Sequence, residues 1–247
     1  MSSVDDGHYE QNVEEENYFI SMTDMMVGLV FIFIILLMYY AMQFRQTTDQ
    51  LTSADRTRST ILTHLKDYLK TKGVKVEIDP RTGVLRLPDE ILFDKAQAKP
   101  KPDGVKALGH LADGLMLILP CYTDGVPRPA DCPGASHKVE SVFIEGHTDS
   151  DRMAGGTGMS DNWDLSVQRA TNTYRQVTGM RPQLVSLCLK TSGAGCNPVL
   201  SVSGYGPTRP LAIGNDEASK QRNRRIDLRI LMAAPKADGS VPLLPHR

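Results

Sequence analysis

A run of 18 uncharged residues near the N-terminus, Met25–Met42, constrains the chain more than any other feature. As a helix it rises about 1.5 Å per residue, and with the preceding YFISMT it is long enough to cross a hydrocarbon core. The alternatives are a buried helix of a soluble protein and a cleaved signal peptide. The leader before the run is acidic, and no small-residue cleavage site follows it, so a signal peptide is disfavoured. Tyr39, Tyr40 and Phe44 resemble an interfacial aromatic belt, and we predict one retained transmembrane helix over residues 18–44.

Charge is divided unevenly along the chain. The first 44 residues contain seven acidic and no basic residues, whereas all 28 basic residues follow with the other 22 of the 29 acidic ones, a balance of +6. This excess is too small to indicate a nucleic-acid partner. Arg45, Arg56 and Arg58 lie C-terminal to the span, and by the positive-inside rule they favour a cytoplasmic C-terminus.

The four cysteines favour the opposite orientation. They lie in two Pro/Gly-rich segments, and of the three possible connectivities we predict the local pairs Cys121–Cys132 and Cys188–Cys196. Disulfides closing such loops contribute about 2–3 kcal/mol each and persist only in an oxidising compartment. A zinc site is the alternative, but these spacings lack the short intervals of zinc knuckles. We therefore predict a single-pass protein of the bacterial inner membrane, with a cytoplasmic N-terminus and a periplasmic C-terminal domain.

The remaining chain is predicted to divide into four further parts. They are a mobile acidic tail at 1–17, a linker passing into an amphipathic helix at 45–73, a folded domain at 74–232 and a second tail at 233–247. Gly73 is the expected end of the amphipathic helix, and Gly179 that of a later helix over 162–179.

Within the domain, strands are predicted to alternate with helices. Strands are expected at 74–78 and 83–88 (a hairpin), 139–149 and 199–206; helices at 105–119 and 162–179; and a helix passing into a strand at 218–232. Such alternation predicts an α/β fold with helices packed on a mixed sheet.

Three segments carry a family pattern in a fixed order. They are IEGHTD at 144–149, NWDLSVQRA at 162–170 and NRRIDLRI at 223–230, with ILFDKAQAKPKPDG upstream. Together they resemble the peptidoglycan-binding OmpA-like domain over about residues 84–232. The cysteine segments and the long connection at 150–160 depart from that pattern, at the rim of the expected binding groove.

The resemblance implies a ligand clamp made of Asp149 and Arg169. A diaminopimelate side chain presents an ammonium and a carboxylate, which an aspartate and the planar fork of an arginine can bind. A turn carboxylate and a surface ion pair are the structural alternatives for these two residues. By the same resemblance, other residues shape the pocket or lie near the sugar: Asn162, Leu165 and Thr148 in the pocket, and Arg225 near the sugar.

No catalytic or metal site is expected. His147, Asp149 and Asp151 alternate as metal ligands on a strand could, but without a second cluster a solvated turn is favoured. No nucleophile–base arrangement and no phosphate loop are apparent. The chain is predicted to be neither an enzyme nor a cofactor-binding protein.

Asp24 precedes the apolar run directly. At a helix start an aspartate can serve as a cap or lie at the interface, but an ionisable group in a span is also a candidate ion carrier. The segment around Thr23–Met26 resembles the MotB family of stator subunits, which join one aspartate-bearing span to a periplasmic OmpA-like domain. That resemblance implies proton transfer at Asp24, and two copies of the chain inside a pentamer of a MotA-like membrane partner.

The acidic leader and the paired cysteines depart from flagellar MotB. They are more similar to the ZorB family, the MotB-like subunits of Zorya anti-phage defence systems, whose partner is the MotA-like ZorA. A flagellar-type stator subunit and a passive membrane-tethered wall anchor remain the alternatives.

Overall fold

The computed structural model describes residues 7–133, 137–152, 160–191 and 195–234. The chain forms two units, Met1–Leu51 and Thr52–Arg247. The first unit holds most of helix α1 (Gly7–Thr71), which is long and apolar enough from Met22 onward to cross a membrane. Its large apolar side chains between Met22 and Phe44 are exposed, as a lipid-facing helix requires. The helix begins at Gly7, within the acidic segment at 1–17 that was predicted to be a mobile tail.

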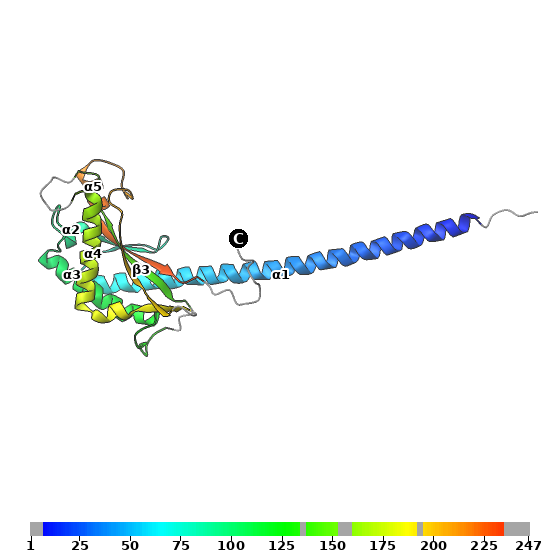
Figure 1. The fold of residues 1–247 in the computed structure, drawn as a ribbon, viewed down its shortest axis with the longest axis horizontal. Helices are drawn as coiled ribbons and strands as arrows, with labels where there is room; N and C mark the ends of the chain where they lie inside the picture. Colours follow the sequence, from blue (N-terminus) through cyan, green and yellow to red (C-terminus); the bar gives the residue numbers. More distant parts are fainter. Residues whose placement is uncertain (1–6, 134–136, 153–159, 192–194, 235–247) are drawn as a thin grey trace, which may run out of the picture. The chain divides into compact units, whose positions relative to one another are not determined.

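The second unit is built on a five-stranded mixed sheet (Figure 1). Its strands lie in the order β1, β2, β7, β3, β6, of which only β3 and β6 pair in parallel. The strand bounds are Glu77–Asp79 for β1, Val84–Pro88 for β2, Val139–His147 for β3, Leu200–Gly204 for β6 and Arg225–Met232 for β7. The predicted mixed α/β fold, including the hairpin of the first two strands, is confirmed.

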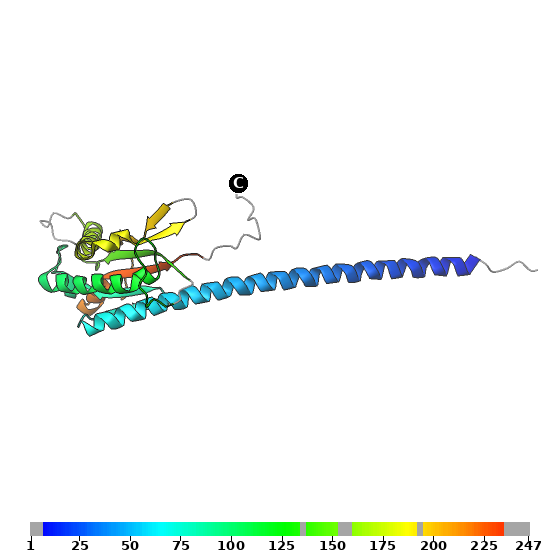
Figure 2. The same cartoon turned by 90° about the horizontal axis from the view of Figure 1, so that it is seen from below.

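Two long helices, α3 (Pro102–Ile118) and α4 (Asn162–Met180), contact each other, and α4 packs on β3 and β6 (Figures 1 and 2). Side chains alternate between the faces of a strand, so Ile226 and Leu228 of β7 face the core while their neighbours face away. α3 also passes the length and apolarity test for a membrane span, but most of its apolar window is buried in this core.

The last turns of α1 belong to the same core. Ile61, Leu62, Leu65 and Leu69 are buried at spacings that place them along one side of the helix. Gly114 of α3 gives this helix room, since a Cβ there would lie 2.8 Å from the Leu65 side chain.

Two glycines were predicted to end helices, and only Gly73 does so. Gly73 adopts φ 76°, and the backbone N–H groups of Gly73 and Val74 donate to the carbonyls of Lys70 and Leu69, so it ends α1 as predicted. Gly179 was predicted to end the second long helix, but α4 continues through it to Met180. The rigid stop comes from Pro182, which begins the 3-10 helix η2 (Pro182–Ser186).

Both predicted disulfides are present. The Cα atoms are 5.3 Å apart in Cys121–Cys132 and 5.4 Å apart in Cys188–Cys196, and no cysteine is free. Cys121 ends the 3-10 helix η1 (Leu119–Cys121). Asp124 and Cys188 exchange both backbone hydrogen bonds, at 2.7 and 3.0 Å, which joins the two disulfide segments to each other.

The second disulfide closes a hairpin that the sequence reading placed in a loop. Its strands are β4 (Cys188–Thr191) and β5 (Gly195–Pro198), and they form a separate two-stranded sheet. The short helices α2 (Asp89–Leu92) and α5 (Glu217–Asn223) complete the fold and lie beside the candidate site.

Candidate functional site

Asp149 lies two residues beyond β3, in the turn that leads toward α4. Its Oδ2 accepts a hydrogen bond from Nη1 of Arg224 at 2.7 Å, and its Oδ1 accepts one from the backbone N–H of Asp151 at 3.2 Å. Asn162, at the start of α4, donates its amide to the carbonyls of Asp149 and Asp151 at 3.3 and 2.7 Å. The helix start thereby holds the turn in place.

Thr148 and Leu165 are buried beneath the surface at this turn and help to hold it in place. Thr148 is buried, its backbone N–H donates to the carbonyl of Gly206 at 3.0 Å, and its hydroxyl donates to the carbonyl of Asp149 at 3.1 Å. Leu165 is buried on the core side of α4. Both residues therefore shape the site through the fold.

Arg169 is only 1% exposed, although it carries the charge expected to bind a ligand. Its Nη1 lies 3.0 Å from Oδ1 of Asp89. Its Nε and Nη2 donate to the carbonyls of Gln97 and Asp94 at 2.8 and 3.3 Å, and its guanidinium lies over the ring of Phe93. The FDKAQ segment at residues 93–97 therefore surrounds the Arg169 guanidinium.

The backbone of this wrapping segment turns at Ala96, which has φ 57°. A non-glycine residue in the left-handed region is strained by about 1–3 kcal/mol, and such strain concentrates at functional sites. The turn lies between the two carbonyls that accept from Arg169. The same contacts that hold the arginine therefore offset the strained turn.

Asp89, Arg224, Asp149 and Arg169 form one cluster of two anions and two cations, in which each charge acts on the others. Burial raises the pKa of Asp89 to about 6, because loss of hydration outweighs the attraction of Arg169 and Arg224. Burial also lowers the pKa of Arg169. Both shifts show that the buried pair is costly to keep ionised.

The residues of the domain that form ion pairs with Arg169 and Asp149 were not predicted from the sequence. Asp89 forms an ion pair with Arg169, and Arg224 forms an ion pair with Asp149. Arg224 is the first arginine of the NRR segment, a signal that was available. No local pattern marks Asp89, because its partner lies 80 positions along the chain.

Arg225, which was predicted to lie near the sugar, makes its contacts within the domain. It is buried, its Nε donates to both carboxylate oxygens of Asp227, and Nη1 and Nη2 donate to the carbonyls of Asn223 and Arg209. Arg224 directly precedes β7 in an extended conformation, so Arg224 reaches Asp149 while Arg225, the first residue of β7, points to the far face of the sheet. The contacts of Arg225 give it a structural role, and its place near a sugar stays a prediction.

The far face of the sheet carries a buried polar cluster of Glu145, His147, Asp227, Arg225 and Arg229. Arg229 forms a two-pronged contact with Glu145 at 2.8 and 3.0 Å. Burial opposes ionisation of Glu145, but contacts with His147 and Arg229 outweigh it and lower its pKa to about 2.

Glu145, His147 and Asp227 place potential metal-ligand atoms within 4.8 Å of one another. Each carboxylate is already paired with an arginine, so we assign the cluster to folding. The predicted alternative of His147, Asp149 and Asp151 as joint ligands is not assembled within the described residues. His147 instead contacts Glu145 and Asp227, and Asp151 pairs with Lys220 at 2.7 Å.

Two further candidate features were predicted from the sequence. Asp24 belongs to the first unit, where its side chain is exposed on α1. The connection at 150–160, expected at the rim of the groove, lies outside the described residues from 153 to 159.

Comparisons with known proteins agree with this architecture. No family model matches the chain. It is 27% identical over 164 residues to the probable lipoprotein YiaD of Escherichia coli, covering 66% of this chain and 58% of the relative. It is 24% identical over 175 residues to Motility protein B of Bacillus subtilis, covering 69% and 55%. The chain thus spans little more than half the length of these relatives.

Among solved structures, a putative MotB-like protein of Desulfovibrio vulgaris shares the fold. The TM-score is 0.51 at 20% sequence identity, and the match covers 77% of this chain and 98% of the other. The architecture is therefore a mixed α/β domain of the OmpA-like, MotB type, preceded by an apolar N-terminal helix.

Proposed function

We propose that the chain is the wall-anchored subunit of an ion-driven motor in the bacterial inner membrane. One observation carries the proposal: an exposed apolar helix that bears Asp24 shares a chain with a domain of MotB-type fold. In this arrangement the N-terminus is cytoplasmic and the domain, with its two disulfides, lies in the periplasm. The role is mechanical and needs no enzymatic chemistry.

The wall anchor is the cluster around Asp149 and Arg169. The ammonium of a diaminopimelate residue would pair with Asp149, and a carboxylate would pair with Arg169. Both groups already have internal counter-ions, so the ligand binds by exchanging Arg224 and Asp89 for its own charges. Because these two internal ion pairs must be broken, the exchange gains less free energy than binding to unpaired charges would, but it leaves no charge without a partner.

The motor function depends on Asp24. One helix cannot enclose an ion path, so we propose two copies of the chain inside a pentamer of a MotA-like membrane partner. A carboxylate that alternates between an apolar and a wet environment can take up and release a proton. One charge crossing 100 mV supplies about 2.3 kcal/mol, and each pH unit adds about 1.36 kcal/mol.

The biological setting that we propose is anti-phage defence of the Zorya type, with a ZorA-like partner. The acidic leader and the two disulfides support it, since both distinguish this chain from the flagellar pattern. A flagellar-type stator and a passive wall anchor are the competing outcomes of the test.

The test substitutes Asp24→Asn, which keeps the side-chain shape but cannot ionise. Cells that carry the chain with its MotA-like partner are scored for phage plating and for motility. The variant should assemble and sediment with peptidoglycan like the wild type, yet lose all protection against phage. Asp49→Asn, on the same helix beyond the apolar run, is the matched control and should protect normally. An assembled Asp24→Asn complex that still protects would identify a passive anchor, and restored motility in place of protection would identify a flagellar stator.

A further inference from the structure

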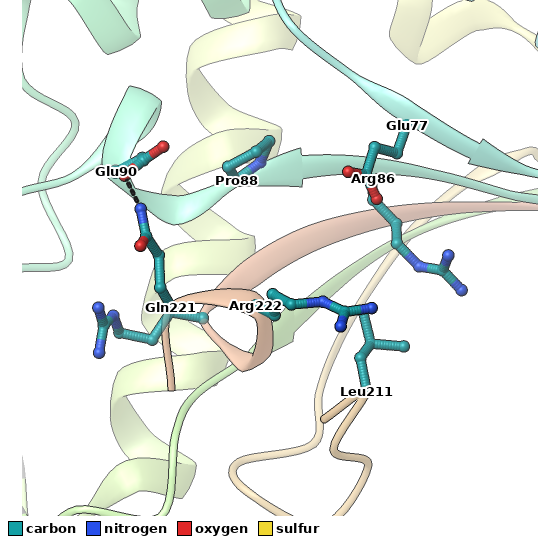
Figure 3. Close-up of a pocket in the computed structure, with 8 residues that line it drawn as sticks. Glu77, Arg86, Pro88, Glu90, Leu211, Gln221 and Arg222 are labelled. Atoms are coloured by element: carbon teal, nitrogen blue, oxygen red, sulfur yellow. Dashed lines mark hydrogen bonds between the residues drawn. The ribbon is translucent and has the colours of Figure 1, made fainter. Parts of the chain in front are cut away.

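A pocket of about 170 Å³ opens between the first two strands, α2 and α5 (Figure 3). It adjoins the polar cluster on the far face of the sheet, because Arg86 of its lining lies opposite Asp227 of that cluster on the neighbouring strand. Its lining residues come from β1, β2, α2, α5 and the segments flanking α5: Glu77, Arg86, Pro88, Glu90, Leu211, Gln221, Arg222 and Arg224.

Two arginines point into this pocket with unused hydrogen-bond donors (Figure 3). Arg86 binds Asp79 through Nη2 at 3.1 Å, but its buried Nε has no hydrogen-bond partner. Arg222 is exposed and forms no ion pair with any residue that the structure describes. Two guanidinium groups that share one small space repel each other unless an anion lies between them, and their planar forks match a carboxylate.

The other lining groups restrict the charge of that anion. The carboxylates of Glu77 and Glu90 also line the pocket, and Glu90 accepts a hydrogen bond from the amide of Gln221. Of the three lining arginines, Arg86 pairs with Asp79 and Arg224 with Asp149, so Arg222 is the one without an ion pair among the described residues. This favours a singly charged carboxylate over a doubly charged phosphate, while Pro88 and Leu211 offer apolar contact to a short side chain.

Arg224 connects the pocket to the candidate wall anchor. It lines the pocket, and its Nη1 lies 2.7 Å from Oδ2 of Asp149. A ligand whose ammonium displaces Arg224 from Asp149 leaves Nη1 of that guanidinium without its acceptor, while Nη2 stays paired with Glu217 at 2.6 Å. We infer that the pocket is a second subsite, which binds the terminal carboxylate of the same peptide whose ammonium binds Asp149. The inference rests on the proposed function.

The test compares two synthetic stem tetrapeptides that contain meso-diaminopimelate, one with a free terminal carboxylate and one with a terminal amide. Both carry a fluorophore at the N-terminus, and binding to the full chain in detergent micelles is followed by fluorescence anisotropy. The wild type should bind the acid about tenfold more tightly than the amide, the low end for a charge-assisted contact. Arg222→Gln should bind both peptides with the affinity that the wild type has for the amide.

Arg175→Gln is the matched control, because Arg175 is an exposed arginine of α4 outside the pocket. It should retain the preference for the acid. A preference that survives in Arg222→Gln would overturn the inference, and so would inorganic phosphate that displaces the acid more strongly than acetate does.

Asp149→Asn separates this inference from the proposed function. It should weaken binding of acid and amide by the same factor. If Asp149→Asn leaves both affinities unchanged while Arg222→Gln still abolishes the preference, the pocket stands and the proposed wall anchor fails. If neither peptide binds the wild type, both fail together.

Discussion

Nη1 of Arg169 lies 3.0 Å from Oδ1 of Asp89, and the two side chains are only 1% and 7% exposed. The arginine that the sequence assigns to ligand binding is therefore also a structural part of the domain. Its removal affects folding as well as recognition.

Arg169→Ala should destabilise the Thr52–Arg247 unit by about 3–5 kcal/mol, because it leaves Asp89 buried without its cation. Urea unfolding followed by the fluorescence of Trp163, the single tryptophan, measures the change. The double variant Arg169→Ala, Asp89→Ala should recover part of the loss, since no unpaired charge remains. Strictly additive losses would contradict the assigned pairing.

The raised pKa of Asp89 predicts a pH dependence of stability. The unfolded carboxyl titrates near 3.8 and the folded one near 6, so the folded chain binds the extra proton between these values. Stability from this group is then highest below about pH 3.8 and falls as pH rises to about 6. The full difference corresponds to about 3 kcal/mol.

The measurement compares wild type and Asp89→Asn from pH 4 to 7.5, so that other titrating groups cancel. The wild type should lose about 2 kcal/mol relative to the variant over this range, because part of the full difference lies below pH 4. A constant difference would show that the folded Asp89 carboxyl titrates at its ordinary pKa.

Gly146 sets how closely α4 approaches the sheet. A Cβ at this position would lie 2.0 Å from the carbonyl oxygen of Ser166, a backbone atom that cannot move alone. Gly146→Ala should cost about 1–3 kcal/mol in unfolding free energy and weaken peptidoglycan sedimentation by displacing Arg169 on the same helix. Gly179→Ala is the control, since nothing lies within 4 Å there, and it should stabilise the helix by about 0.5–1 kcal/mol.

The two disulfides should be recoverable from cells. Non-reducing peptide mapping of the membrane fraction should yield Cys121–Cys132 and Cys188–Cys196 as local links. Replacing either pair with serines should lower the unfolding free energy by about 2–3 kcal/mol. Four free thiols in cells would remove the main argument for a periplasmic domain.

The proposed pairing of two spans can be tested by crosslinking. Single cysteines placed between Leu29 and Tyr39 should crosslink two copies of the chain, with other positions crosslinking to the MotA-like partner. The positions that react should recur with helical spacing, because only one side of each helix faces its twin. Strictly monomeric protein after co-expression with the partner would contradict the arrangement.

Local sequence patterns correctly predicted those helix ends and strand pairs that are determined by residues close to one another in the sequence. The β1–β2 hairpin and the end of α1 at Gly73 both depend on residues within one turn or strand. The β4–β5 hairpin was missed because its short strands are stabilised by a disulfide and by pairing with Asp124.

The candidate site was predicted only in part. Asp149 and Asn162 meet as expected, because a strand end and the following helix start adjoin in this fold. The ion pair of Arg169 with Asp89 depends on packing between residues far apart in the sequence, which the periodicity of apolar residues does not predict. The contact of Arg224 with Asp149 depends on strand register, which shifts every side chain to the opposite face when it changes by one residue.

The row of buried residues on the last turns of α1, from Ile61 to Leu69, has a mechanical consequence. A tensile load directed along this segment would act on these buried side chains together, because they lie along one side of it within one core. Contacts loaded in parallel share the force, whereas contacts peeled open in series fail one at a time. The last turns of α1 should therefore resist a pull along their axis more strongly than a pull that peels them away from the core.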